Sequence, residues 1–261
     1  MGCLKKIGLG LAVLYLLLCA VLYVVQERII FDPHPLSQDH RFRAGEEVYL
    51  EVAPDVQLNC LFLKEKPSRG VVLYLHGNRG NIRRCIRQAR MMADNGYDIF
   101  IPDYRSYGKS QGQISSEQQL FSDVQKAYDY LKQSYSEDQI VIVGYSLGSG
   151  MASYLAANNQ PKALALVAPY YSFPDLKNSR IPFLPDFILK YHLNNYKFLA
   201  QTNCPTTLFH GTLDEIIPYD SSVRLEQIDP QKISLVTMEG VSHRGAIFDN
   251  RFKSGMRKIL Q

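Results

Sequence analysis

Short apolar runs alternate along this chain with segments whose apolar residues recur at helical spacing, and this alternation restricts the fold more than any other feature. The apolar runs are Val71–Leu75, Ile99–Pro102, Ile140–Gly144, Ala163–Ala168, Thr206–His210 and Ile233–Met238. The helical segments are Ile82–Asp94, Gln118–Gln133 and Leu147–Asn158. Strands that are apolar throughout are buried on both faces, and strands that alternate with helices are joined by crossovers. The pattern predicts an α/β fold: a mostly parallel sheet with helices on both faces.

Two regions depart from this alternation. Val48–Val52 and Gln57–Leu63 are β-like runs separated by Ala-Pro-Asp, which is typical of an antiparallel hairpin. Residues 170–200 lie between two predicted strands, contain three prolines and offer only short helical patches such as Asp186–His192. Insertions of this length over an α/β sheet are often lids, so we expect a short lid at about residues 170–200.

The longest apolar stretch of the chain lies near its N-terminus. The nineteen residues from Ile7 to Val25 carry no charge. As a helix rising about 1.5 Å per residue they would extend roughly 28 Å, close to a hydrocarbon core of about 30 Å. We therefore expect one transmembrane helix as a membrane anchor in residues 1–30, a polar tether in residues 31–45 and the α/β domain in residues 46–261.

Removal of this stretch is the alternative to an anchor. A signal peptide has a shorter apolar core, of about 7–15 residues, and small residues at its cleavage site, whereas charged and polar residues follow here at 26–28. A lipoprotein signal would need a small residue before Cys19, and a myristoylation motif would need Ser or Thr at position 6; the sequence has neither. Lys5 and Lys6 precede the stretch, so the positive-inside rule favours a cytoplasmic N-terminus and a catalytic domain on the non-cytoplasmic side.

Composition narrows the possible functions of the chain. The formal net charge is only +4, and no dense run of Lys and Arg is present, which argues against a nucleic-acid-binding protein. The five cysteines show no metal-binding spacing and no disulfide framework. We expect no metal and no organic cofactor. No feature of the sequence indicates an oligomeric state.

A G-x-S-x-G motif at residues 144–148 joins a predicted strand to a predicted helix. A serine on such a sharp turn projects its hydroxyl beyond the C-terminal edge of the sheet, and the flanking glycines let neighbouring backbone pass closely. The N-terminus of the following helix directs free N–H groups at developing negative charge. A serine in an ordinary tight turn is the alternative, but its partners favour Ser146 as a nucleophile.

A serine nucleophile needs a base, and the base needs an acid that orients it. In this topology both follow the serine, in the order Ser, Asp, His. His243 lies in a short polar loop after the last predicted strand, and Asp214 lies in the loop after the preceding strand. Glu215 and Asp220 are the substitutes for Asp214. The other histidines lie in the tether, in the lid or at strand ends, where we expect them to shape loops: His34, His40, His192, His76 and His210.

An oxyanion hole requires two N–H groups near the nucleophile. The backbone N–H of Leu147, directly after the serine, is the first candidate. The loop after the first parallel strand supplies the second, and we expect the backbone N–H of Asn78 there. The side chain of Asn78 could instead only brace this turn.

From about Gly45 onward the chain resembles the α/β-hydrolase superfamily, and within it the membrane-anchored, Bem-like serine hydrolase branch. The motifs that carry the resemblance are HGNRGN (76–81), DYRSYGKSQG (103–112), GYSLGSG (144–150), HGTLDEIIP (210–218) and GVSH (240–243). The resemblance implies esterase, acyl-protein thioesterase or peptidase-like activity behind a single N-terminal span. Ser106 and Ser149 stand where relatives often have glycine, which bears on loop shape. Residues 103–105 are expected to buttress the active-site face.

These features predict a serine hydrolase that cleaves an ester or a thioester through an acyl-enzyme, with Ser146 as nucleophile, His243 as base and Asp214 as its orienting acid. A peptidase-like amide hydrolase and a non-catalytic hydrolase-fold binding module are the alternatives; binding modules typically lose one of these three residues. The aromatic lid, close to a bilayer, suits a small-molecule acyl or lipid substrate, and its lysines suit an anionic headgroup. Equally, these aromatic residues could simply pack the lid onto the sheet.

Overall fold

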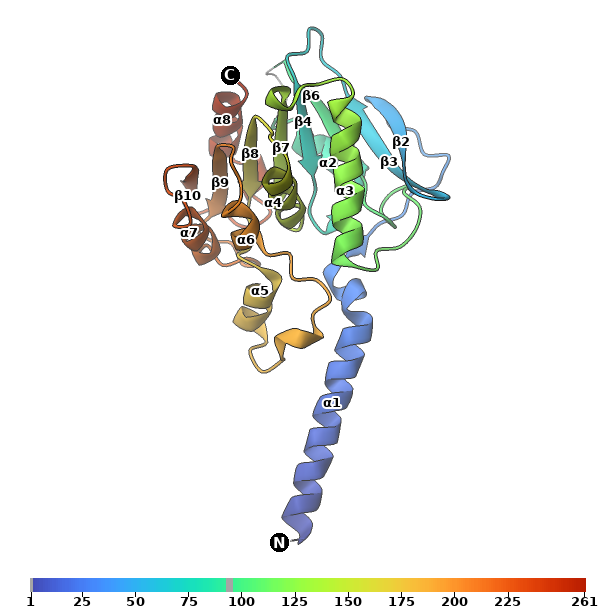
Figure 1. The fold of residues 1–261 in the computed structure, drawn as a ribbon, viewed down its shortest axis with the longest axis vertical. Helices are drawn as coiled ribbons and strands as arrows, with labels where there is room; N and C mark the ends of the chain where they lie inside the picture. Colours follow the sequence, from blue (N-terminus) through green and yellow to red (C-terminus); the bar gives the residue numbers. More distant parts are fainter. Residues whose placement is uncertain (1, 93–95) are drawn as a thin grey trace.

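The computed structural model describes residues 2–92 and 96–261, and its core is an eight-stranded sheet (Figure 1). In chain order the strands are β2 Glu46–Ala53, β3 Val56–Leu63, β4 Val71–Leu75, β6 Asp98–Pro102, β7 Ile140–Tyr145, β8 Ala163–Val167, β9 Thr206–Gly211 and β10 Ile233–Met238. Their spatial order is β10-β9-β8-β7-β4-β6-β3-β2. β3 runs antiparallel to β2 and β6, and the other pairs are parallel. The predicted α/β fold and its N-terminal hairpin are confirmed.

Helices cover both faces of this sheet. They are α2 Ile82–Ala89, α3 Glu117–Lys132, α4 Gly148–Asn158, α6 Asn195–Leu199, α7 Asp220–Glu226 and α8 Asn250–Ile259, with short 3₁₀ turns η1 Glu137–Gln139 and η3 Ala246–Phe248. Buried residues of α3, α4, α6 and α7 form one apolar cluster with the sheet, and those of α2 and α8 form a second. The strands of this sheet from β3 to β10 contribute side chains to both clusters, which is why most of their residues are apolar, whereas the edge strand β2 contributes only to the first.

The first crossover helix is shorter than its sequence pattern predicted. We expected a helix over Ile82–Asp94, but α2 ends at Ala89. Residues 93 and 94 of the expected helix lie outside the described residues. Gly96 has a φ of 67° just before β6, a conformation that few other residues adopt. The chain therefore has to leave the helix early enough to turn back into β6.

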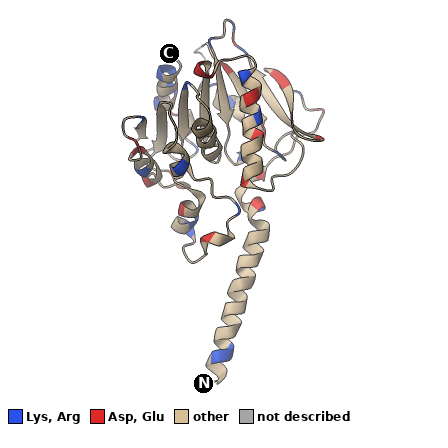
Figure 2. Cartoon of the chain, viewed as in Figure 1, with Lys and Arg blue, Asp and Glu red and all other residues tan. Residues whose placement is uncertain are grey.

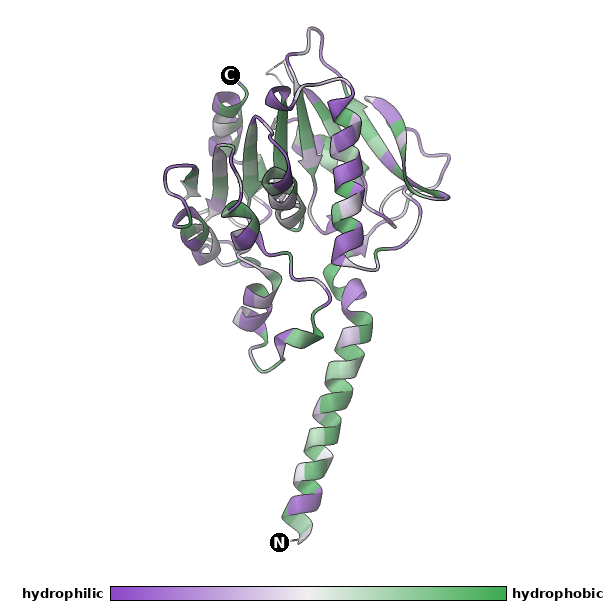
Figure 3. Ribbon diagram, in the orientation of Figure 1, coloured by the Kyte–Doolittle hydropathy of each residue, from purple (hydrophilic) through white to green (hydrophobic). Residues whose placement is uncertain are grey.

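The N-terminal helix α1, Gly2–Ile30, projects from the body of the molecule (Figure 1). It is long and apolar enough to cross a membrane, and only 6% of its most apolar 18-residue stretch is buried. In Figure 3 most of this helix has the colour of hydrophobic residues, and Figure 2 shows charged residues near its two ends rather than in its middle. Cys19 and Gln26 are its buried residues.

The segment expected to be a tether, residues 31–45, begins in contact with the catalytic domain. Its first residues form the short strand β1, Asp32–Pro33, which pairs in parallel with β5, Arg79–Gly80. Further along, the N–H of Leu36 donates to the carbonyl of Gly108 over 2.7 Å. These bonds hold α1 next to the loop that follows β4.

Residues 170–200, which we call the lid, connect β8 to β9 and contain α5 Phe173–Arg180, η2 Asp186–Ile188 and α6. The predicted helical patch Asp186–His192 is reduced to η2, whereas α5 was not predicted. Pro174 is compatible with α5 because it occupies the first turn, where its missing N–H costs no hydrogen bond. Ser172 caps the helix by accepting from the N–H of Asp175.

Candidate active site

Ser146 lies on the sharp turn between β7 and α4. Its φ is 52°, an unfavourable value for a residue other than glycine. The two glycines of the motif permit this turn through close packing. A Cβ on Gly148 would lie 2.0 Å from the carbonyl oxygen of Leu75, and one on Gly144 would lie 2.6 Å from the Cβ of Ala152. The motif thus packs the start of α4 tightly against β4 and β7, with Ser146 at the C-terminal edge of the sheet.

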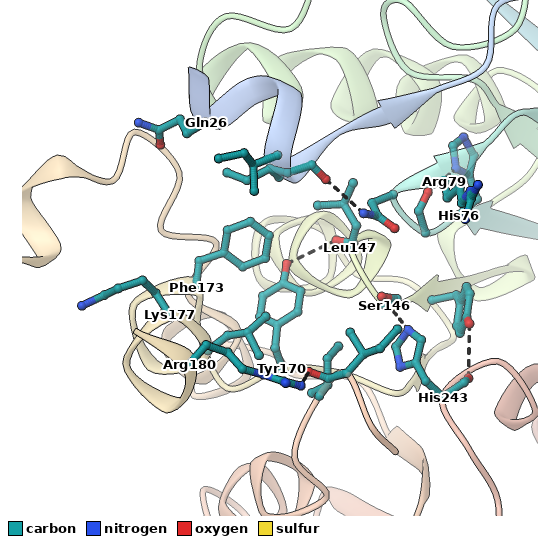
Figure 4. Close-up of a pocket in the computed structure, with 18 of the residues that line it drawn as sticks. Gln26, His76, Arg79, Ser146, Leu147, Tyr170, Phe173, Lys177, Arg180 and His243 are labelled. Atoms are coloured by element: carbon teal, nitrogen blue, oxygen red, sulfur yellow. Dashed lines mark hydrogen bonds between the residues drawn. The ribbon is translucent and has the colours of Figure 1, made fainter. Parts of the chain in front are cut away.

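The structure brings the three predicted catalytic residues into contact. Nε2 of His243 lies 3.1 Å from Oγ of Ser146, a bond drawn in Figure 4. Nδ1 of His243 lies 2.7 Å from Oδ2 of Asp214. All three side chains are buried. The imidazole therefore bridges a hydroxyl and a carboxylate that lie 68 residues apart in the sequence.

The carboxylate of Asp214 is fully buried and accepts four contacts. Its Oδ1 accepts from the backbone N–H groups of Ile216 and Ile217, over 2.9 and 2.7 Å. Its Oδ2 meets His243 and also Nε2 of His210, at 3.2 Å. Burial alone would raise the pKa of Asp214, but the hydrogen bonds from His210 and His243 outweigh it and hold this pKa well below its ordinary value. The group is thus an anion at neutral pH.

His210 contacts the carboxylate of Asp214, which the sequence did not lead us to expect. We expected it to shape a loop at the end of β9, and it does lie in that strand. Its Nδ1 lies 2.7 Å from Oγ of Ser222, while its Nε2 faces both Asp214 and the carbonyl of Ile217. Because two acceptors face Nε2, this nitrogen carries the proton. The sequence feature that could have indicated this contact is the short spacing: His210 and Asp214 are four residues apart and lie on either side of the end of β9.

The two alternative acids occupy other positions. Glu215 is exposed, and its Oε2 accepts from the backbone N–H of His243, not from the ring. The hydrogen bonds from its own backbone N–H and from that of His243 lower the pKa of Glu215. Asp220 pairs with Arg224 on α7. The geometry therefore favours Asp214 as the partner of the imidazole.

Both expected oxyanion-hole residues line the cavity beside Ser146. Within the described chain, neither the backbone N–H of Leu147 nor that of Asn78 donates a hydrogen bond. The Asn78 side chain donates to the carbonyl of Ile30 over 3.2 Å. The backbone carbonyl of Asn78 accepts from the N–H of Asp32 and from the hydroxyl of Tyr107. The side chain thus braces the end of α1, while both N–H groups are free to bind an oxyanion.

A second buried His–Asp pair lies beneath the loop that carries Asn78. Nε2 of His76 lies 3.3 Å from Oδ1 of Asp103, but without hydrogen-bond geometry. The hydroxyl of Tyr104 donates to the carbonyl of His76 over 2.8 Å. Arg105 makes a bidentate ion pair with Asp123 on α3. Residues 103–105 therefore lie where we expected a buttress for this loop.

The two serines that replace family glycines have different surroundings. Ser106 has a φ of 69°, in the left-handed region that favours glycine, and its Oγ donates to the carbonyl of Gly112. Ser149 is buried at the start of α4, where its Oγ accepts from Asn195 of the lid over 3.0 Å.

A cavity of about 400 Å³ opens at Ser146 (Figure 4), a volume typical of small-molecule sites. Three parts of the chain form its walls: α1, the lid and the loops at the edge of the sheet. Most of its lining is apolar. Its charged lining residues are all basic: Arg79, Arg84, Lys177, Arg180 and Arg244.

Comparison with known families assigns the chain. Residues 66–203, more than half of the sequence, match the model of a family described as serine aminopeptidase, S33. The chain belongs to this family of α/β-hydrolases.

Individual relatives agree with this assignment. An uncharacterized protein of Mycobacterium tuberculosis (strain ATCC 25618 / H37Rv) is 29% identical over 84% of this chain and 80% of its own length. The human alpha/beta hydrolase domain-containing protein 17C is 28% identical over 77% of this chain and 61% of its own length. The lysophosphatidylserine lipase ABHD12 of Danio rerio is 30% identical, over 64% of this chain and 49% of its own length.

Solved structures share the fold at low sequence identity. The Pyrococcus furiosus esterase Pf2001 superimposes with a TM-score of 0.71 at 16% identity, over 88% of this chain and 97% of the esterase. Est1E from Butyrivibrio proteoclasticus, bound to ferulic acid, has a TM-score of 0.66 at 19% identity, over 81% of this chain and 96% of its own. These structures therefore show the same fold as this chain.

Proposed function

We propose that this chain is a serine hydrolase that cleaves acyl esters or thioesters through an acyl-enzyme on Ser146. The observation that carries this proposal is the continuous contact from Ser146 through His243 to Asp214. A weakly nucleophilic hydroxyl becomes reactive when an oriented imidazole takes its proton. Ser146 and His243 also line a cavity large enough for a small acyl substrate, which supports the proposal.

The mechanism follows from the hydrogen bonds of the imidazole. With its proton on Nδ1, His243 donates to Asp214 and accepts from Ser146 at Nε2. As Oγ attacks the acyl carbonyl, its proton passes to Nε2, and the anionic Asp214 stabilises the resulting imidazolium. The backbone N–H groups of Leu147 and Asn78 bind the oxyanion. The imidazolium protonates the leaving group, and His243 then activates the water that hydrolyses the acyl-enzyme.

The cavity supports an acyl or lipid ester over a peptide. An enzyme that trims peptides from the N-terminus has to bind a free ammonium, which requires a carboxylate, and no acidic residue is among those that line the cavity. Arg79 and Lys177 are paired with Asp32 and Asp186, but Arg84 and Arg244 also line the cavity and suit an anionic substrate. The relative named lysophosphatidylserine lipase and the esterases with the same fold are in line with ester hydrolysis.

We further propose that α1 anchors the enzyme as a single-pass membrane protein of the Bem-like branch. Lys5 and Lys6 at the start of α1 favour a cytoplasmic N-terminus, which places the catalytic domain on the non-cytoplasmic side.

The decisive test is reaction of the full-length protein in detergent with a fluorophosphonate probe, followed by mass spectrometry of the adduct. We expect labelling at Ser146 that Ser146→Ala and His243→Ala abolish, and hydrolysis reduced by about 10⁶-fold in Ser146→Ala. Ser106→Ala is the matched control, because this serine lies outside the cavity, and it should keep full labelling. Folded native protein that resists the probe would sink the proposal in favour of a binding module.

A further inference from the structure

Helix α1 forms part of the cavity wall in addition to projecting from the domain. Its residues Leu22, Gln26, Ile29 and Ile30 line the same cavity as Ser146. In Figure 4, Gln26 and the lid residues Phe173 and Lys177 stand across the cavity from Ser146. The helix that is apolar enough to cross a membrane therefore continues directly into the wall of the candidate active site.

A polar clamp fastens α1 to the lid. Gln26 is buried, and its Nε2 donates to the carbonyl of Ile188 over 3.0 Å. Its Oε1 accepts from the backbone N–H of Lys190 over 2.8 Å. The next residue, Glu27, makes an ion pair with the Lys190 ammonium. Because Gln26 satisfies a backbone donor and a backbone acceptor of the lid, helix and lid are held as one unit.

The lid lies alongside α1 as far as Tyr15, within the apolar stretch of that helix. The hydroxyl of Tyr15 donates to the carbonyl of Phe183 over 2.8 Å. Tyr15 precedes Gln26 by eleven residues, which corresponds to about 16 Å along the helix axis. Cys19 packs with Leu184 and Ile188 between these two points. If α1 spans a bilayer, the tip of the lid lies inside that bilayer.

The exposed side chains of the lid tip fit this environment. Phe183 is 65% exposed and Phe187 is 82% exposed, whereas Tyr170 and Tyr191 of the same lid are buried against the domain. Most lid aromatics thus pack onto the sheet, as one of our alternatives expected, but these two do not. Large apolar side chains left open beside an apolar helix mark contact with lipid.

We infer that the cavity walled by α1 and the lid opens into the hydrocarbon of the membrane, so that the acyl chain of a membrane-resident ester enters it sideways from the bilayer and reaches Ser146. The anchor helix is then part of the substrate site. This inference rests on the proposed ester hydrolysis and adds the route and the chain-binding groove. The occupant of the groove is an acyl chain of at least moderate length.

A pair of tryptophan variants on α1 tests the groove. Leu22→Trp fills the cavity side of the helix, whereas Val24 lies at the same depth, is 70% exposed and does not line the cavity. Full-length protein in phosphatidylcholine vesicles would be assayed with the palmitoyl and the acetyl ester of 4-methylumbelliferone, which share one leaving group. We expect Leu22→Trp to lower kcat/KM for the palmitoyl ester about a hundredfold more than for the acetyl ester, as when about three methylene groups lose their burial. Val24→Trp should spare both esters.

A second variant covers the case in which Leu22→Trp disturbs the whole site. Phe183→Ser with Phe187→Ser changes only exposed side chains, and we expect about a tenfold loss on the palmitoyl ester in vesicles with unchanged acetyl ester hydrolysis. Equal palmitoyl ester hydrolysis by the native chain and by both the Leu22 and the double serine variants would overturn the inference.

Photolabelling separates this inference from the proposed function. Ser146→Ala protein in vesicles that contain a diazirine-bearing palmitic acid would be irradiated, and the adducts mapped by mass spectrometry. This readout needs no catalysis, so it decides the route even if no ester is hydrolysed. Adducts on residues 181–189 of the lid as well as on α1 support the inference. Adducts on α1 with none on the lid would show that the lid lies outside the membrane.

Discussion

Two buried His–Asp pairs lie at the C-terminal edge of the same sheet, and they differ in the hydrogen bonds that reach the carboxylate. Asp214, paired with His243, accepts from two imidazoles and two backbone N–H groups. Asp103 lies 3.3 Å from His76, but no hydrogen bond reaches either of its oxygens from the described residues. The two carboxyl pKa values consequently shift in opposite directions.

Burial raises the pKa of the carboxyl in both pairs, so the hydrogen bonds decide the direction of the net shift. For Asp214 they outweigh burial and lower the pKa. For Asp103 burial prevails and raises the pKa, and the electrostatic interaction with His76 offsets it only in part. Gly108 closes over Asp103 so tightly that a Cβ there would lie 2.0 Å from Oδ2. A histidine beside a carboxylate is therefore not by itself a catalytic pair.

Among the substitutions that test this comparison, Asp214→Asn should have the largest effect on catalysis. The amide keeps the shape but cannot stabilise an imidazolium and favours the wrong tautomer of His243, so we expect kcat to fall by about 10⁴-fold. Steady-state hydrolysis of the acetyl ester measures this loss. Asp220→Asn, on the next helix, is the matched control and should stay within about twofold of the native rate, because a surface ion pair contributes little.

The same variant has a predicted pH signature. A depressed pKa gives the native protein stability that is present above the unfolded pKa of about 3.9 and is lost as the pH falls through the folded value. Asp214→Asn should therefore be least stable relative to the native protein at neutral pH. Thermal unfolding followed by circular dichroism would contradict this if the deficit grew on acidification.

His210→Ala should have an intermediate effect. It removes one hydrogen bond to the Asp214 carboxylate and leaves the contact with His243 in place. A bond to a charged group contributes about 1.5–3 kcal/mol, which corresponds to roughly a tenfold to hundredfold loss of kcat/KM. His210→Gln, which keeps an N–H donor, should recover part of the activity. Failure of Gln to improve on Ala would mean that His210 acts through packing and not through this bond.

Local sequence pattern was sufficient to predict the sheet and the positions of the three candidate catalytic residues. Ser146 directly follows β7, and Asp214 and His243 lie in the loops after β9 and β10. Because parallel strands end at one edge of a sheet, residues that follow them converge there. The sequence favoured Asp214 but left Glu215 open as a substitute, and the structure adds that Glu215 accepts from the backbone N–H of His243 and not from its ring.

Other features depend on contacts that no local pattern contains. Gln26 and Ile188 lie 162 residues apart, so the contact between α1 and the lid could not be inferred from either segment. Helix α5 lies in a segment with three prolines and was not predicted, although proline is tolerated in the first helical turn, where Pro174 lies. The raised pKa of Asp103 likewise arises from Gly108 and neighbouring elements that close over it.

Asp103→Asn should have the smallest effect on catalysis and the opposite effect on stability. Asp103 does not line the cavity, so we expect kcat/KM to change by less than about tenfold, or 1.4 kcal/mol. Its raised pKa means that the folded protein retains a proton that the unfolded chain releases above about pH 3.9. Native stability therefore falls as the pH rises from there to the folded pKa, and is level beyond it.

Asparagine carries no titratable proton, so the Asp103→Asn protein lacks this fall. Its thermal midpoint relative to the native protein should rise with pH across that window. That of Asp214→Asn should sink as the pH rises towards about 3.9 and stay level above it. The two variants form a matched pair when they are measured in the same detergent. Both native carboxylates are buried, but only that of Asp214 accepts hydrogen bonds from the part of the chain that the structure describes. If both curves had the same slope, burial alone would govern the two carboxyls, and the hydrogen bonds to Asp214 could not be what prepares it to stabilise a charged imidazole.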